Sequence, residues 1–182
     1  MLRAIIGTAA VLAGFGVLER SVDASTGHAG SCTATQAYAL LQGGETVPVR
    51  TEPTPHAAVI GTLSGRRTDG AGRARSDVTI TGSQSGWARI ALNTAQGYAA
   101  AGNGQSFGWI PADLLTVDTR VDGTITVHNR PGLLGSPIAS IDGEDMKFRV
   151  LGCRGNLLQV INERHGNGWI DKWCAREEGC RG

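Results

Sequence analysis

Val78–Ile90 (VTITGSQSGWARI) and Phe148–Val160 (FRVLGCRGNLLQV) carry the same pattern, and this pattern decides the fold. In each stretch an alternating apolar run leads to a glycine, Gly82 or Gly152, and a second alternating run follows a polar turn. Alternation with a period of two predicts a half-buried strand, and two such runs across a short glycine-containing turn predict a hairpin. The sequence therefore predicts the same β-hairpin twice.

The match extends outward into flanking segments, which pair Val47–Leu63 with Ile125–Ile141 and Gly108–Ile110 with Gly168–Ile170. Spacing within the matched segments is equal, and the first copy is longer only between them, in residues 64–77 and 91–107. Loops absorb insertions more readily than strands, so this is how a duplicated β-domain varies. Two small modules on one chain favour binding over catalysis.

The class of the chain is all-β, because no long helical apolar stripe follows residue 24 and many short strand signals lie among 27 glycines. We expect domains at 45–117 and 122–182, with an N-terminal segment at 25–44. Within that segment, Thr35–Leu41 is either a strand or a short helix. Domains of about 60 to 75 residues are marginally stable alone, and we expect Trp87, Trp109, Trp169 and Trp173 to help fill their cores.

The N-terminus has the layout of a secretory signal peptide. Arg3 precedes an apolar run from Ala4 to Leu18, and small residues allow cleavage after Ala24. The run is short for a membrane span, and no later run reaches the required length of about 20 residues. We expect residues 1–24 to be removed and the protein to be periplasmic or secreted; an uncleaved anchor is the alternative.

Secretion permits disulfides, and the cysteines are even in number: Cys32, Cys153, Cys174 and Cys180. Three connectivities are possible. Pairing of Cys153 with Cys174 or Cys180 would pin the C-terminal tail to the second module, and pairing with Cys32 would join the two domains. We expect the first arrangement.

The composition predicts no nucleic-acid partner, metal or cofactor. The formal net charge is +1, so the chain has no basic footprint for nucleic acid. The four histidines are scattered singly, and Cys174 and Cys180 lie farther apart than paired zinc ligands usually do.

The ordered landmarks of the first copy are Val49-Arg50-x-x-Pro53, Val59-Ile60-Gly61-x-Leu63, Gly86-Trp87-x-x-Ile90 and Gly108-Trp109-Ile110. Together they resemble the bacterial SH3 domain, SH3b, over about residues 45–115 and again over about 123–174. The second copy departs from the pattern, with His128-Asn129-Arg130-Pro131 at the first landmark and Leu157 in place of Trp87. The resemblance implies two small SH3-like barrels in tandem, which bind cell-wall peptidoglycan or envelope proteins.

Candidate ligand-binding residues follow from these landmarks. Arg50 and Glu52 enter the proline turn beside the expected groove, where an arginine can clamp a carboxylate through two hydrogen bonds; a solvated surface pair is the alternative. Trp109 and Trp169 follow glycine at the same landmark and are either core residues or the aromatic wall of a peptide groove. Trp87 aligns with Leu157, which favours an apolar core position.

Each insertion of the first copy adds candidates. Residues 64–77 are expected to form a flexible loop whose arginines either contact anionic polymers or remain solvated. Residues 91–107 contain Tyr98 and Phe107, and Tyr98 either stacks on a ligand or covers a barrel end. Because the second copy lacks both insertions, we expect ligand specificity to reside in the first.

The sequence leaves three functional hypotheses. The first is a non-catalytic envelope protein that recognises a peptidoglycan peptide, and the second is a protein adaptor without affinity for the wall. The third is a small thiol or metal hydrolase, for which Cys174 with Glu163-Arg164-His165 is the one suggestive grouping. We expect no enzyme, because a catalytic thiol must be reduced and of low pKa. Ligand identity and oligomeric state are not determined by the sequence.

Overall fold

The computed structural model describes residues 30–68, 72–102, 104–142, 147–175 and 180. The expected signal peptide, residues 1–24, lies outside these residues. In the described part, no helix has both the length and the apolarity needed to span a membrane.

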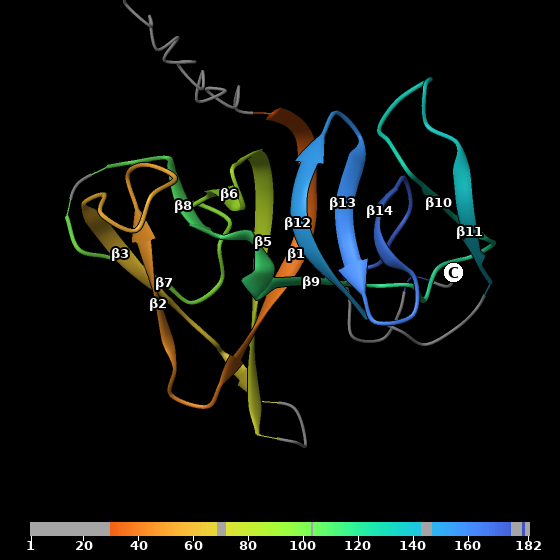
Figure 1. The fold of residues 1–182 in the computed structure, drawn as a ribbon. Coiled ribbons are helices and arrows are strands. Elements are labelled where there is room, and N and C mark those ends of the chain that lie inside the picture. Colours follow the sequence, from red (N-terminus) through yellow and green to blue (C-terminus); the bar gives the residue numbers. More distant parts are fainter. Residues whose placement is uncertain (1–29, 69–71, 103, 143–146, 176–179, 181–182) are drawn as a thin grey trace, which may run out of the picture.

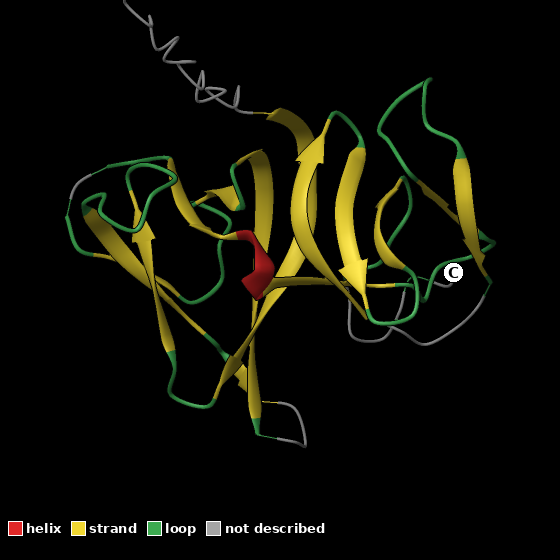
Figure 2. Cartoon of the chain, in the orientation of Figure 1, coloured by secondary structure: helices red, strands yellow, loops and turns green. Residues whose placement is uncertain are grey.

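The described chain is all-β, which confirms the predicted class (Figures 1 and 2). The first copy and its leading segment contain β1 (Gly30–Gln42), β2 (Thr46–Arg50), β3 (Val59–Ser64), β4 (Arg67–Thr68), β5 (Arg73–Gln84), β6 (Trp87–Ala91), β7 (Tyr98–Ala100) and β8 (Phe107–Pro111). A short 3₁₀ turn, Ala112–Leu114, leads into the remaining strands: β9 (Leu115–Asp118), β10 (Ile125–His128), β11 (Pro137–Ile141), β12 (Lys147–Arg154), β13 (Leu157–Asn162) and β14 (Gly166–Ile170).

The strands are hydrogen-bonded in one continuous antiparallel order, β11-β10-β14-β13-β12-β9-β1-β5-β6-β8-β2-β3-β7, with β4 paired to β5. Both sequence copies therefore belong to a single open sheet order, and they meet where β9 pairs with β1 and β12. Figure 1 shows the first copy on one side of this junction and the second on the other.

The predicted repeat is visible as equal strand register. In the β5–β6 hairpin the pairing shifts between Ile80 and Gly82, so that Gly82 faces Arg89. In the β12–β13 hairpin it shifts between Val150 and Gly152, so that Gly152 faces Gln159. Such a shift marks a β-bulge or irregularity, and bulges re-aim side chains and increase local twist. The two hairpins are therefore bent at the same place.

Most of the expected N-terminal segment, residues 30–42, forms strand β1. The open choice for Thr35–Leu41 resolves as strand, because β1 pairs with β5 from Gly30 to Gln42. The same strand also pairs with β9 through Tyr38 and Ala39. Ala37, Tyr38 and Ala39 are consecutive and all buried, so both faces of β1 are covered here, and a strand covered on both faces does not alternate.

Much of the first insertion is strand, contrary to the expected flexible loop. Arg73–Asp77 belong to β5 and pair with Tyr38–Gln42 of β1. Arg66 donates its backbone N–H to the Arg75 carbonyl at 2.9 Å, and Arg67–Thr68 form β4. Residues 69–71 lie outside the described part. The insertion therefore extends the central strands.

The core contains residues from both copies but none of the tryptophans. Its largest fully buried side chains are Tyr38, Phe148 and several leucines and isoleucines. Trp87, Trp109, Trp169 and Trp173 are all half-buried. Trp173 packs against the core, whereas for the other three the expectation that they fill the cores is wrong. Each of Trp87, Trp109 and Trp169 is followed by a fully buried alanine or isoleucine, because alternation puts successive side chains on opposite faces.

The disulfides join Cys32 to Cys153 and Cys174 to Cys180. The expected pairing of Cys153 with the C-terminal cysteines is therefore wrong. The tip of the β12–β13 hairpin lies against the start of β1, where Thr33 donates its backbone N–H to the Gly155 carbonyl at 2.7 Å. Ser83 also bonds both the N–H and the carbonyl of Cys153, at 2.9 and 3.1 Å. This contact places Cys153 beside Cys32.

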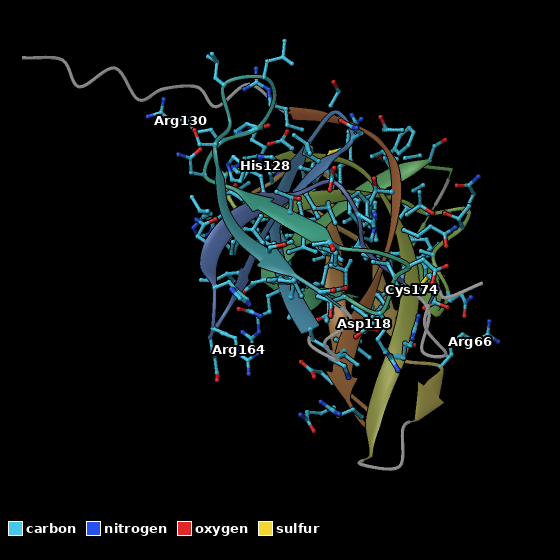
Figure 3. The ribbon with its side chains drawn as sticks, turned by 90° about the vertical axis from the view of Figure 1, so that its right-hand side faces the viewer. Arg66, Asp118, His128, Arg130, Arg164 and Cys174 are labelled. Atoms are coloured by element: carbon cyan, nitrogen blue, oxygen red, sulfur yellow. A yellow bond between two sulfur atoms is a disulfide. The ribbon has the colours of Figure 1, made fainter. Side chains whose placement is uncertain are left out.

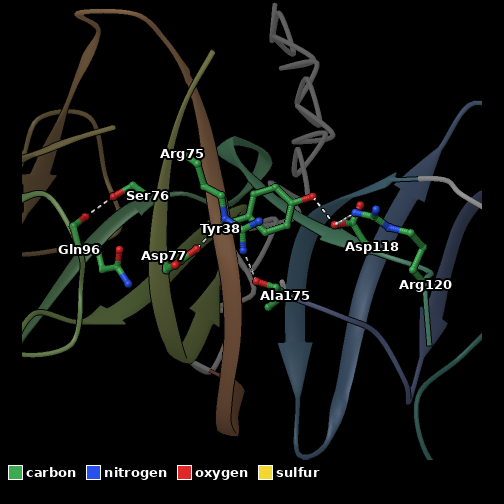
Figure 4. Close-up of polar contacts among 8 residues, drawn as sticks. All are labelled: Tyr38, Arg75, Ser76, Asp77, Gln96, Asp118, Arg120 and Ala175. Atoms are coloured by element: carbon green, nitrogen blue, oxygen red, sulfur yellow. Dashed lines mark hydrogen bonds and ion pairs between the residues drawn. The ribbon is translucent and has the colours of Figure 1, made fainter. Parts of the chain in front are cut away.

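A buried polar cluster lies at the junction of the copies (Figure 4). The Tyr38 hydroxyl donates to Oδ2 of Asp118 at 2.9 Å, and Arg120 forms an ion pair with the same oxygen at 3.3 Å. The Arg75 guanidinium lies 4.1 Å from the centroid of the Tyr38 ring and also bonds the Ala175 carbonyl. Burial raises the pKa of Tyr38 far above its ordinary range, and the Asp118 carboxylate raises it further.

The two disulfides are expected to stabilise the fold unequally. Cys32–Cys153 closes a separation of 121 residues and Cys174–Cys180 one of 6, which corresponds to about 5 and about 2 kcal/mol of unfolded-state entropy. Urea unfolding should therefore show a larger loss of stability for Cys32→Ala/Cys153→Ala than for the matched pair Cys174→Ala/Cys180→Ala. Equal losses would contradict this ranking.

Tyr38 is expected to make stability fall at alkaline pH. Its raised pKa keeps the folded phenol neutral while the unfolded one ionises above about pH 10, so unfolding becomes easier as pH rises beyond that value. Tyr38→Phe loses about 1 to 3 kcal/mol at neutral pH, because Asp118 loses its hydrogen-bond donor. The stability gap to wild type, measured by urea unfolding, should narrow above about pH 10; a constant gap would refute the linkage.

Candidate functional site

The outer face of β2, β8 and β6 gathers four of the seven candidates. Trp87 lies on β6, Phe107 and Trp109 lie on β8, and Arg50 ends β2. Along these strands their side chains alternate with buried ones, so all four are on the side away from the core. Sequence reasoning missed Arg89, which shares this face. We call these five residues the aromatic–arginine face.

Trp109 occupies the middle of the aromatic–arginine face. It is the register partner of Arg89 on one side and of Arg50 on the other. Directly opposite residues in an antiparallel pair have Cβ atoms about 4.5 to 5.5 Å apart. The half-buried indole is therefore flanked by two guanidinium-bearing residues.

Arg89 is held in place by its neighbours. Its Nε donates to the Thr81 hydroxyl and its Nη2 to the Thr81 carbonyl, both at 3.1 Å. Its guanidinium lies 5.2 Å from the centroid of the Phe107 ring, within the range of a cation–π contact. Phe107 itself is 46% exposed, so an aromatic ring and a fixed cation are presented together.

Arg50 shapes the turn that borders the aromatic–arginine face. Its Nη1 donates to the Ala57 carbonyl at 2.8 Å, and Thr51 closes the same turn with a backbone bond of 3.0 Å to Ala58. Glu52 is exposed in this turn. Arg50 thus donates to a backbone carbonyl of the turn, and the Glu52 side chain is exposed beside it.

Trp87 lies at the end of the aromatic–arginine face, opposite Pro111. It is half-buried, whereas Ala88 beside it is fully buried. The expectation that Trp87 is a core residue is therefore wrong. The alternation Trp87-Ala88-Arg89-Ile90 already contained this signal.

Tyr98 lies away from the aromatic–arginine face. It belongs to β7, where it pairs with Leu63 of β3, and its hydroxyl donates to the Ile60 carbonyl at 3.0 Å. Together with Val59 it lines a small pocket of about 180 Å³. The contact to Ile60 fits the second reading of Tyr98, a ring that covers one end of the strands.

Trp169 is the counterpart of Trp109 but has different neighbours. Its register partners are His128 and Gln159, in the positions that Arg50 and Arg89 occupy in the first copy. It lines a cleft of about 820 Å³, whose other walls come from the β5–β6 and β12–β13 turns and the start of β1. The second copy therefore repeats the tryptophan but not the flanking arginines.

A basic groove also lies between the copies. It has a volume of about 960 Å³, and its lining includes Arg73, Lys147, Arg149, Arg164 and a single acidic residue, Glu163. Sequence reasoning did not select Lys147 or Arg149. The alternation of β12, with both residues exposed between buried ones, would have placed them on one outer face.

In the grouping that suggested a hydrolase, the cysteine sulfur is part of a disulfide. Cys174 is joined to Cys180, so a thiolate there would require prior reduction. His165 follows β13 and donates its backbone N–H to Oδ1 of Asn162 at 2.7 Å. In the part of the chain that the structure covers, no cluster of three or more His, Cys, Asp or Glu side chains has the geometry to hold a metal ion.

Comparison with known proteins gives weak structural likeness only. No family model matches the chain, and no curated protein matches it. Among solved structures it is similar to NlpC1 from Trichomonas vaginalis, at 18% identity over 78% of this chain and 45% of that one, with a TM-score of 0.33. NlpC2 from the same organism gives 17% identity, 79% and 49% coverage and a TM-score of 0.33. The chain spans about half the length of each.

Proposed function

We propose that this protein is a non-catalytic binding protein of the cell envelope, secreted or periplasmic. In this proposal it consists of two SH3-like barrels in tandem. The aromatic–arginine face of the first binds a peptide of the peptidoglycan type through a carboxylate. The second module is mainly structural or binds another partner.

Backbone pairing at the end of each copy supports the barrel interpretation. Leu115, which ends the first copy, pairs with Ala39 of β1, the strand beside its hairpin. In the second copy, Cys174 and Asp118 exchange backbone hydrogen bonds of 2.8 Å, and Asp118 belongs to β9 beside that hairpin. In each copy the end of the chain thus lies beside a strand that flanks the hairpin, which fits the barrel that we propose.

The observation that carries the proposal is the position of Trp109 between Arg50 and Arg89. A guanidinium can bind a carboxylate through two parallel hydrogen bonds, and an indole provides a flat apolar surface for peptide groups and side-chain stems. Peptidoglycan stem peptides are short, carry carboxylates and contain no large aromatic group. Their chemistry fits a shallow face with one aromatic centre and two cations.

The compartment is part of the proposal. Both cysteine pairs are disulfide-bonded, which is compatible with an oxidising environment outside the cytosol. Neither disulfide lies on the aromatic–arginine face, so the disulfides stabilise the fold and take no direct part in binding there. Binding there needs only side chains that the scaffold presents.

Trp109 and Trp169 offer a matched test. Trp109→Leu should weaken retention on purified peptidoglycan sacculi by about 30-fold, because a central tryptophan in a binding surface is worth about 2 kcal/mol or more. Trp169→Leu changes the equivalent residue of the second copy and should alter retention by less than about threefold. Sedimentation with sacculi across a salt series measures both.

The control for the cations is Arg50→Lys, which keeps the charge but cannot form the two-bond contact. It should reduce retention, whereas the counterpart change His128→Lys should not. Wild-type protein that is never retained by sacculi, even at low salt, would refute wall binding. In that case a pull-down returning one stoichiometric protein would favour the adaptor function.

A further inference from the structure

The β10–β11 hairpin ends in two leucines that no described residue covers. Leu133 is 106% exposed and Leu134 is 84% exposed, the two highest values among the exposed large apolar residues. Ile138, just beyond them on β11, is 51% exposed. Single exposed leucines are ordinary, but a contiguous apolar projection marks a contact site. We call Gly132–Gly135 the leucine tip.

Backbone geometry holds the leucine tip in an open shape. Asn129 and Ser136 close its base with bonds of 3.0 Å between backbone groups and 2.9 Å to the Asn129 side chain. The Gly135 N–H donates to the Gly132 carbonyl at 3.0 Å, and Gly132 has a positive φ of 80°. A Cβ on Gly135 would overlap the Arg130 carbonyl. The two leucines therefore project from a tightly hydrogen-bonded turn.

The first copy shows that the fold does not require these leucines. The register of β2–β3 matches that of β10–β11, with a shift at Arg50 in one and at His128 in the other. Counting from those residues, Leu133 and Leu134 correspond to Pro55 and His56, and Arg130 corresponds to Glu52. The second copy therefore has an apolar, basic tip where the first has a polar, acidic one.

The hairpin that carries the leucine tip contains an arginine and no acidic residue. Residues 125–141 contain Arg130 and His128 but no aspartate or glutamate. Arg130 is exposed at the base of the tip, and Figure 3 shows it beside the projecting loop. An apolar end with a cation behind it is complementary to an anionic lipid surface. The leucine side chains would enter the boundary of the acyl region, and the Arg130 guanidinium would contact the anionic headgroups.

We propose that the leucine tip inserts into the surface of an anionic lipid bilayer. The convex shape favours lipid over a protein partner, because a bilayer admits a projection without a preformed pocket. The start of β1 lies at the same end of the molecule as the turn between β10 and β11 (Figure 1). The apolar run Ala4–Leu18 precedes β1 in the sequence, and its retention as an anchor, the alternative to cleavage, would bring this end towards the membrane. This inference is independent of the proposed wall binding.

Vesicle flotation tests the proposal on residues 25–182, which contain all the described strands and both disulfides. The vesicles contain equal amounts of phosphatidylglycerol and phosphatidylcholine. Leu133→Ser/Leu134→Ser should lower the lipid partition coefficient about a hundredfold, about tenfold for each leucine withdrawn from the apolar phase. The matched first-copy variant, Pro55→Ser/His56→Ser, should float like wild type.

Arg130→Glu installs the first-copy residue at the base of the leucine tip. It should weaken flotation with anionic vesicles and leave that with pure phosphatidylcholine unchanged. The proposal is overturned if wild-type protein does not float at low salt, or if the double leucine variant floats equally well. It is also overturned if sedimentation equilibrium shows that the leucines instead join two copies of the chain.

Discussion

The pairing of β9 with both β1 and β12 is the constraint on which the rest of this structure depends. The strand that ends the first copy is hydrogen-bonded to a strand of each copy, so the two copies are joined through backbone pairing. The buried core accordingly runs through both copies. Small domains bury too little surface to be very stable alone, and sharing a strand compensates for this. We expect the two halves to unfold as one unit.

Joining the two copies through β9 brings polar groups into the interior. Asp118 is 1% exposed, and a buried carboxylate is costly unless hydrogen-bonded and paired. Tyr38 supplies the hydrogen bond and Arg120 the charge, while Arg75 joins the ring of Tyr38 to the C-terminal segment. These contacts are directional, so they fix the angle between the copies as well as offsetting the cost of burial.

The sequence predicted the hairpins and their duplication because period-two alternation is a local signal. It did not decide the state of Thr35–Leu41, since a strand that is buried on both faces loses that alternation. The partner of Cys153 depends on which strand lies beside β1, which spacing alone does not contain. The face containing Trp87 and Arg89 was readable from alternation, yet the size of tryptophan suggested a core residue. For Trp87, the alternation of the strand predicted the position correctly, whereas the size of the side chain did not.

The disulfide pairing has a consequence for how the chain matures. The bonds join the first cysteine to the second and the third to the fourth in chain order. A chain that emerges N-terminus first exposes Cys32 and Cys153 before Cys174 and Cys180, so oxidation in order of appearance yields the native pairs. No wrong bond then has to be exchanged through a mixed-disulfide intermediate. Correct oxidation would thus depend on the direction of emergence more than on an isomerase.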